Sequence, residues 1–174
     1  MSSTPTTPPT FTIDRPRLED VPAIARIHVD GWRVAYSHLL AGEQWFGQQA
    51  VDRRTTQWTS WLTPDTPAHD QGIYRIGRDA EGTPIGLAAS WPPREKQPVR
   101  GRELSILYIE EAWFGSGLGR ALAESVLDGG PASVWVAEEN PRARRFYEKL
   151  GFTPDGAARV EEQLGNIRDI RMVR

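Results

Sequence analysis

The chain has 174 residues and a formal net charge of −2 at pH 7, with 39% hydrophobic and 25% charged residues. This length suits one domain with a full hydrophobic core. The near-neutral charge argues against a dedicated nucleic-acid-binding protein, whose binding face is strongly basic. The chain contains no cysteine, which excludes disulfides, thiolate metal sites and cysteine nucleophiles.

The sequence gives no indication of a metal site or a membrane partner. The three histidines, His28, His38 and His69, are neither clustered nor at the spacing of metal ligands. No apolar run is long enough to span a bilayer and no signal-peptide pattern opens the chain, so we expect a cytoplasmic protein. Residues 1–10 (MSSTPTTPPT) are polar and proline-rich, which predicts a disordered tail before a domain over 11–174.

Hydrophobic periodicity and turn residues predict a series of helices and strands. An apolar face at helical spacing follows Asp20 and Pro22, a capping residue and a residue suited to the first helical turn. In the first part of the chain we expect a strand over 11–15, helical regions from Asp20 and over roughly 43–62, a loop over 64–72, strands over 72–78 and 84–91, and a loop over 91–102. In the second part we expect a strand over 103–109, a helix from Leu118 to Asp128, a strand over 133–137 and a helix from Asn140 to Gly151. Two last strands, near 157–163 and 167–174, are expected to be joined by a hairpin turn at 164–166.

This order of elements is typical of a mixed α/β domain. The strand–helix–strand segment over 103–137 implies one parallel pair of strands, because a helical crossover is what parallel neighbours need.

The segment FGSGLGRAL (114–122) places three glycines between a predicted strand and a predicted helix. It does not fit the dinucleotide fingerprint G-x-G-x-x-G, because the sixth position from Gly115 is Arg120, and the chain has no Gly-Lys pair for a P-loop. A strand–turn–helix with G-x-G-x-G presents unpaired N–H groups and the positive end of the helix dipole to an anion. The alternative is a tight turn whose glycines serve turn geometry alone.

Two segments, ELSILYIEEAWFGSGLGRAL (103–122) and VWVAEENPRARRFYEKLGF (134–152), together resemble the GCN5-related N-acetyltransferases, the GNAT superfamily. Residues 16–40 are similar to the family's first helical region, and DIRMVR (169–174) resembles its last strand. The resemblance implies fold class α/β (α+β): a single domain with a mixed, mostly antiparallel sheet that is splayed at its centre and has helices on both faces.

The resemblance also implies acetyl-CoA as a co-substrate and no metal. In the family the glycine segment, usually Q/R-x-x-G-x-G/A, holds the pyrophosphate of acetyl-CoA, and Phe114 stands here where glutamine or arginine is usual. A splayed strand frees backbone amides for the pantetheine arm, which the family's asparagine also contacts. The residues expected to bind the donor are Tyr108, Ile109, Phe114, Gly115, Ser116, Gly117, Leu118, Gly119, Arg120, Asn140 and Tyr147.

Acetyl transfer needs a deprotonated amine, a stabilised oxyanion and a proton for the leaving thiolate. The resemblance makes Tyr147 the general acid and Glu103 the general base, commonly through a water. From the residues alone, Tyr147 also fits a core position on the apolar stripe of its helix, and Glu103 fits a solvated carboxylate at a strand's start. Because the chain has no cysteine, the commonest covalent route is absent, and we expect direct attack in a ternary complex.

The acceptor pocket is the part that the sequence describes least. Trp32, Tyr36 and Trp91 are aromatic candidates for its wall, with packing as their alternative role, and His28 is expected to be a hydrogen-bonded core histidine. The predicted function is an acetyl-CoA-dependent N-acetyltransferase, an acyltransferase acting on a primary amine of a small molecule. The alternatives are another acyl donor, a protein or peptide N-terminal amine, and a non-catalytic acyl-CoA sensor. Homodimers are common in the family, so a homodimer is an open alternative to a monomer.

Overall fold

The computed structural model describes residues 10–162 and 165–174. The tail predicted at 1–10 lies outside this part except for its last residue, as does Leu164 of the predicted hairpin turn. The helices are α1 (Val21–Tyr36), α2 (Glu43–Phe46), α3 (Gln48–Leu62), α4 (Pro67–Gln71), α5 (Leu118–Leu127) and α6 (Pro141–Lys149), with 3-10 turns η1 (Leu18–Asp20) and η2 (Glu111–Trp113). The strands are β1 (Thr12–Asp14), β2 (Ile73–Arg78), β3 (Pro84–Trp91), β4 (Glu103–Ile109), β5 (Ser133–Ala137), β6 (Thr153–Glu161) and β7 (Ile167–Val173).

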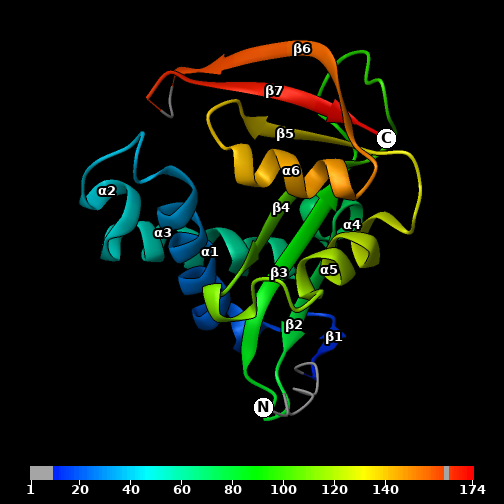
Figure 1. The fold of residues 1–174 in the computed structure, drawn as a ribbon. Coiled ribbons are helices and arrows are strands. Elements are labelled where there is room, and N and C mark those ends of the chain that lie inside the picture. Colours follow the sequence, from blue (N-terminus) through cyan, green and yellow to red (C-terminus); the bar gives the residue numbers. More distant parts are fainter. Residues whose placement is uncertain (1–9, 163–164) are drawn as a thin grey trace, which may run out of the picture.

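The seven strands of the described residues form one sheet in the order β1-β2-β3-β4-β5-β7-β6. Every neighbouring pair is antiparallel except β4 and β5, which are parallel and pair at a single position, Glu103 opposite Ser133. Beyond that position they diverge, so that β5, β6 and β7 lie at one end of the molecule and β1, β2 and β3 at the other (Figure 1). This confirms the predicted mixed, mostly antiparallel sheet with its central splay.

Strand β4 carries a β-bulge at Ser105. Ser90 of β3 lies opposite Leu104, and its neighbour Ala89 lies opposite Ile106, so Ser105 is an extra residue on β4. Residues two apart in a strand normally face the same side, but here Leu104 packs in the core with α5 and Ile106 packs in the core with α1 and α3. The bulge therefore changes the face of the sheet to which the following side chains of β4 point, close to the position where β5 diverges from β4.

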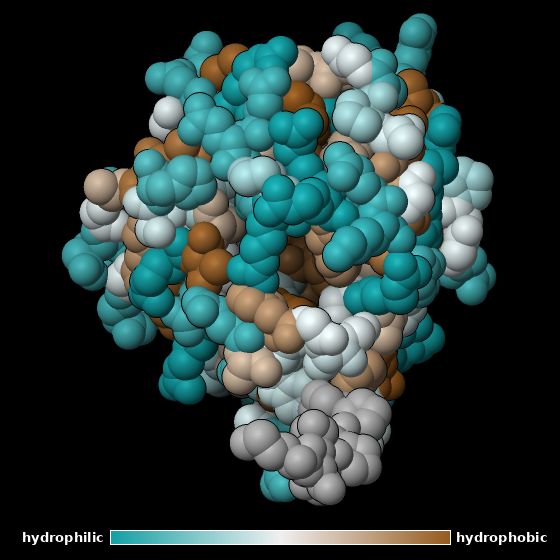
Figure 2. All heavy atoms as spheres, in the orientation of Figure 1, coloured by the Kyte–Doolittle hydropathy of each residue, from teal (hydrophilic) through white to brown (hydrophobic). Residues whose placement is uncertain are grey.

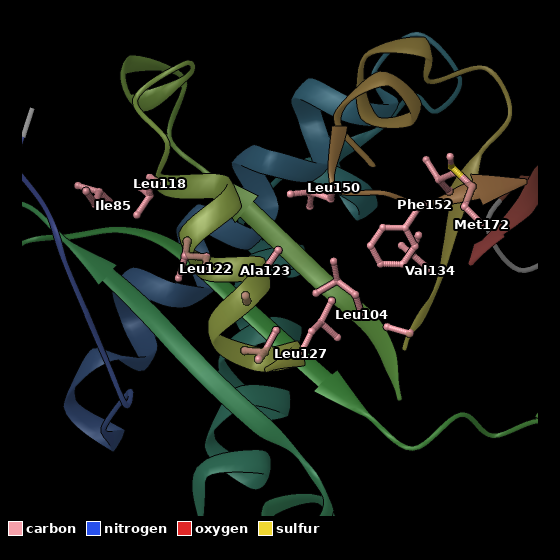
Figure 3. Packing of buried hydrophobic residues seen from close by; sticks show 14 residues of the cluster. Ile85, Leu104, Leu118, Leu122, Ala123, Leu127, Val134, Leu150, Phe152 and Met172 are labelled. Atoms are coloured by element: carbon pink, nitrogen blue, oxygen red, sulfur yellow. The ribbon is translucent and has the colours of Figure 1, made fainter. Parts of the chain in front are cut away.

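Hydrophobic cores cover the two faces of the sheet. Helices α5 and α6 pack on one face, and α1 and α3 pack on the other, as predicted. His28 lies in the second core, 3% exposed, where its Nδ1 accepts a hydrogen bond from Nε1 of Trp58 (3.1 Å), which confirms the expected core histidine. Figure 3 shows the first core, to which α5, β4, β5, β7 and the residue after α6 contribute Leu122, Leu104, Val134, Met172 and Leu150.

Two boundaries differ from the sequence prediction. The helical region over 43–62 is divided into α2 and α3, because the backbone is extended at Gly47, with φ −90° and ψ −168°. Strand β6 begins at Thr153, before the expected start near 157.

The loop predicted over 64–72 contains the short helix α4. The sequence carries its start signal, because the hydroxyl of Thr66 accepts a hydrogen bond from the N–H of His69 and Pro67 occupies the first helical position. Among the described residues no helix is both long and apolar enough to cross a membrane.

The side chain of Asp20 does not cap α1 as expected. It accepts hydrogen bonds from the backbone N–H of Arg17 (2.8 Å) and from the guanidinium of Arg78 on β2 (3.0 and 2.8 Å). Only 8% of the Asp20 side chain and 17% of the Arg78 side chain are exposed, so this ion pair ties the start of α1 to β2. Burial raises the pKa of the Asp20 carboxyl, but the hydrogen bonds from Arg78 and Arg17 outweigh it, and the pKa lies below its ordinary value of 3.8.

Replacing Asp20 by alanine should lower the free energy of unfolding by about 3 kcal/mol, because it removes the closest carboxylate from a largely buried guanidinium. Urea-induced unfolding measures the change. The matched control is Glu19→Ala, because the Glu19–Arg17 pair is 72% and 70% exposed. Its loss should change the free energy by less than about 0.5 kcal/mol. Equal effects of the two substitutions would contradict a special role for Asp20.

The contribution of Asp20 should also depend on pH. Because its pKa is lower in the folded than in the unfolded state, the ion pair stabilises the fold above the unfolded-state pKa and loses this effect as the pH falls through the folded-state pKa. The stability difference between the wild type and Asp20→Ala should therefore shrink as the pH falls below about 4.

Candidate functional site

Where β4 and β5 diverge, the molecule has a cleft of about 600 Å³. Its walls come from the C-terminal half of α1, from β4, β5 and α6, and from the loop that precedes α5. Figure 2 shows a hollow on this face, with hydrophobic residues in its depth and many hydrophilic residues around it. Because β5 pairs with β4 only at Glu103, the rest of this edge of β4 has no strand partner among the described residues, and Tyr108 and Ile109 line the cleft there.

Gly115 and Gly117 form the turn that leads into α5. Both have a left-handed backbone, with φ of 82° and 92°, which a residue with a side chain adopts only at a cost. Within residues 10–162 and 165–174, no group accepts a hydrogen bond from the N–H of Gly115, Gly117, Gly119 or Arg120. These N–H groups lie at the positive end of the α5 dipole, so the loop is suited to bind an anion.

The other loop residues shape the turn. A Cβ added to Gly119 would lie 3.3 Å from the ring of Phe146, so the missing side chain lets α5 pack closely against α6. The side chain of Leu118 is fully buried in the core, and the hydroxyl of Ser116 accepts a hydrogen bond from the N–H of Leu118 (3.2 Å). Neither Ser116 nor Leu118 lines the cleft.

The cleft wall is basic. In the described part of the chain it contains no acidic residue and four basic ones, Arg120, Arg142, Arg145 and Lys149. The guanidinium carbon of Arg142 lies 3.5 Å from the centre of the Phe114 ring, which places a cation on the glycine loop. Arg120 donates a hydrogen bond to the carbonyl of Lys149 (2.7 Å) and so joins α5 to the end of α6.

Asn140 and Tyr147 lie on the α6 side of the cleft, and both line it. The side-chain oxygen of Asn140 caps α6 by accepting a hydrogen bond from the N–H of Ala143 (3.0 Å). The ring of Tyr147 packs against Phe146 and Phe152. Burial raises the pKa of the Tyr147 hydroxyl well above its ordinary value of 10.0, so the hydroxyl keeps its proton at neutral pH. Tyr147 thus combines a packing role with access to the cleft.

Glu103 lies at the closed end of the gap, at the position where β4 pairs with β5. The hydroxyl of Ser105 donates a hydrogen bond to its Oε1 (3.0 Å). Burial raises the pKa of the Glu103 carboxyl above its ordinary value, and the Ser105 hydrogen bond opposes this rise. Glu103 itself is not part of the cleft wall, but Ser105 is.

The three aromatic residues proposed for the acceptor pocket have different locations. Tyr36 lines the cleft, and burial raises its pKa to about 12. Trp32 packs against Tyr36, with ring centres 4.8 Å apart, and lines a separate cavity. Trp91 does not line the cleft, because it packs in the second core against Trp61 and Tyr74, with ring centres 5.0 and 5.2 Å away.

The C-terminal strands bring further residues to this region that the sequence did not indicate. Trp135 of β5 lines the cleft, and the guanidinium carbon of Arg159 lies 4.3 Å from its ring centre. Asp169 of β7 is 9% exposed, with Oδ2 3.5 Å from Nη2 of Arg159, and burial raises its pKa. These residues meet because β7 pairs with both β5 and β6, which no local sequence pattern reveals.

Comparisons with known proteins agree with this architecture. A sequence model of the Acetyltransferase (GNAT) family matches residues 26–152. The uncharacterized N-acetyltransferase YuaI of Bacillus subtilis (strain 168) is 29% identical over 163 residues, which cover 90% of this chain and 87% of YuaI.

Solved structures have the same fold at low sequence identity. PaiA N-acetyltransferase from Thermoplasma acidophilum, in complex with coenzyme A, matches with a TM-score of 0.65 and 16% identity over 93% of this chain and 98% of its own. A variant of spermidine N-acetyltransferase SpeG from Vibrio cholerae matches with a TM-score of 0.63 and 20% identity over 94% and 92%. With the family match spanning most of its residues, the chain belongs to the GNAT family of acetyltransferases.

Proposed function

We propose that this protein is an acetyl-CoA-dependent N-acetyltransferase that transfers an acetyl group to a primary amine of a small molecule, by direct attack in a ternary complex. The proposal rests on the cleft between β4 and β5, where free N–H groups and four basic residues adjoin an unpaired strand edge. A donor with phosphates at one end and an amide-containing arm matches both features, because phosphates need cations and N–H donors while amides need backbone partners.

Each part of the donor has candidate partners in the cleft. The pyrophosphate is expected at the N–H groups of Gly115 and Gly117 and the first turn of α5. Arg142, which stacks on Phe114, supplies a cation where relatives have glutamine or arginine in the loop itself. The pantetheine arm is expected along the free edge of β4 at Tyr108 and Ile109.

The proposed chemistry assigns the acid to Tyr147 and the base to Glu103. The amine nitrogen attacks the thioester carbonyl carbon and loses a proton, through a water, to the carboxylate of Glu103. The carbon–sulfur bond then breaks, and the departing sulfur takes the proton of the Tyr147 hydroxyl, which gives an amide and free CoA thiol. Burial supports both roles, because it keeps Tyr147 protonated and raises the basicity of Glu103.

A small-molecule acceptor is supported by the cleft, whose volume is about 600 Å³, and by the name of one solved structure with the same fold. The aromatic wall at Tyr36 and Trp135 is part of the cleft itself. A protein with this fold is named for spermidine, a small amine.

Two measurements test the proposed function. Acetyl-CoA should raise the unfolding temperature, and NAD and ATP should not; protection by NAD or ATP alone would contradict the assignment of the glycine loop.

A thiol-release assay across small amines and N-terminal peptides should then show CoA release with at least one small amine. Release only with peptides, or only with another acyl-CoA, would favour the corresponding alternative. Protection without release for any amine would favour an acyl-CoA sensor.

Replacing Tyr147 by phenylalanine should lower kcat about 100-fold, because it removes the proton donor for the thiolate. The KM for acetyl-CoA should change little, since the ring and its packing remain. Steady-state CoA release measures both. The matched control is Tyr74→Phe, which removes a partly buried hydroxyl that donates a hydrogen bond to the carbonyl of Ala68, and neither residue lines the cleft. Unchanged kcat in Tyr147→Phe would assign Tyr147 to the core alone.

Replacing Glu103 by glutamine should remove an acidic limb from the pH profile of kcat/KM and lower its plateau about 100-fold. In the wild type the rate should rise with pH as Glu103 loses its proton, at a pH above the ordinary value of 4.5 because burial raises its pKa. Ser105→Ala removes the hydrogen bond that favours the carboxylate, so the limb should move to higher pH. A limb that is the same in all three proteins would rule out Glu103 as the base.

A further inference from the structure

Glu95, in the loop of residues 92–102 between β3 and β4, contacts two strands of the C-terminal half of the sheet. Its Oε1 accepts a hydrogen bond from Nε1 of Trp135 on β5 (3.3 Å). Its Oε2 accepts a hydrogen bond from Nη1 of Arg171 on β7 (2.7 Å). The Glu95 side chain is 30% exposed and the Arg171 side chain 13%. An indole has a single hydrogen-bond donor, so the ring of Trp135 cannot turn without breaking its bond to Glu95.

Neutralising Arg171 does not require Glu95. Nε of Arg171 also donates a hydrogen bond to Oδ2 of Asp155 on β6 (2.8 Å), and the Asp155 side chain is 19% exposed. One carboxylate balances the charge of one guanidinium, so Asp155 already supplies what the buried arginine needs. The two carboxylates are alike in their bond to Arg171, and they differ in that Glu95 also bonds to the indole of Trp135.

The ring of Trp135 lies on the side of β5 that faces away from the proposed donor site. Its neighbours Val134 and Val136 pack in the core with α5, and successive residues of a strand face opposite sides, so Trp135 faces away from α5. The glycine loop, where the donor phosphates are expected, leads into α5. Ala137 is on the same side as Trp135 and belongs to a cluster against which Tyr36 of the cleft wall packs. In a ternary complex this is the side left for the acceptor.

The proposed base is on the same side. Leu104 packs in the core with α5, so its neighbour Glu103 faces away from α5, as Trp135 does. Trp135 comes two residues after Ser133, the residue of β5 that pairs with Glu103. Burial raises the pKa of the Glu103 carboxyl, and the negative charge of Glu95 adds to this rise. Glu95 and Trp135 therefore lie beside the group that is expected to take the proton of the amine.

We propose that Glu95 is a positioning residue: it holds the ring of Trp135 as a wall of the acceptor site beside Glu103 and so determines how tightly the acceptor binds. This inference rests on the proposed acetyltransferase function. Because the indole N–H is bonded to Glu95, the acceptor meets the ring itself and not a hydrogen-bond donor. Without Glu95 the ring is free to turn, and the acceptor loses a preorganised wall while the donor site keeps its groups.

Steady-state CoA release, with the panel amine of highest kcat/KM and at the plateau of the pH profile, tests this. Glu95→Ala should raise the KM for the amine about 10-fold and change kcat and the KM for acetyl-CoA less than about 2-fold. Glu95→Gln keeps an oxygen for the indole N–H and should stay within about 3-fold of the wild-type KM. Asp155→Ala, the matched control, removes the other carboxylate bonded to Arg171 and should leave the KM for the amine unchanged.

A double-mutant cycle separates the bond to Trp135 from a general loosening of the loop. Trp135→Phe removes the indole N–H and should raise the KM for the amine by itself; in that background Glu95→Ala should add less than about 2-fold. A further rise of about 10-fold in the double variant would show that Glu95 acts without Trp135 and would overturn the inference. An equal rise in Asp155→Ala, or an unchanged KM in Glu95→Ala, would also overturn it, and each would leave the acetyltransferase proposal intact.

A second readout does not require turnover. The indole N–H signal of Trp135 in a proton–nitrogen NMR spectrum is identified by its absence in Trp135→Phe. Glu95→Ala should shift this signal and speed its exchange with water, and Asp155→Ala should not; an identical signal in Glu95→Ala and the wild type would overturn the inference. Absence of CoA release with every amine would count against the proposed function and against an acceptor wall at Trp135, and the indole signal would then decide whether Glu95 orients the ring.

Discussion

One break in the sheet determines the rest of this molecule: β4 and β5 are hydrogen-bonded neighbours at a single position, Glu103 opposite Ser133. The bulge at Ser105 bends β4, and β5 is held in its own direction by β7. Buried backbone N–H and C=O groups need partners, so the unpaired edge of β4 is stable only where water or a ligand reaches it. The cleft is therefore a consequence of the strand geometry and not of a missing side chain.

Two kinds of group surround this break. The start of α5 offers N–H groups and the helix dipole, and Arg142 and Arg145 of α6 add positive charge on the same wall. Burial also pushes the pKa values of Tyr147, on α6, and of Glu103, at the closed end of the gap, upward. Tyr147 thereby stays a proton donor while Glu103 becomes a stronger base, an arrangement suited to moving one proton in and another out.

The parts that could be predicted from the sequence are those encoded locally. The glycine loop, the cap at Asn140 and the strand at 103–109 depend on neighbours within a few residues, and the family resemblance rested on the same segments. Residues that the sequence did not indicate, or whose side chains lie elsewhere than predicted, depend on contacts with distant parts of the chain. Trp135 reaches the cleft through pairing with β7, Trp91 turns into the core because of Trp61 and Tyr74, and Asp20 bonds to Arg78 on another strand.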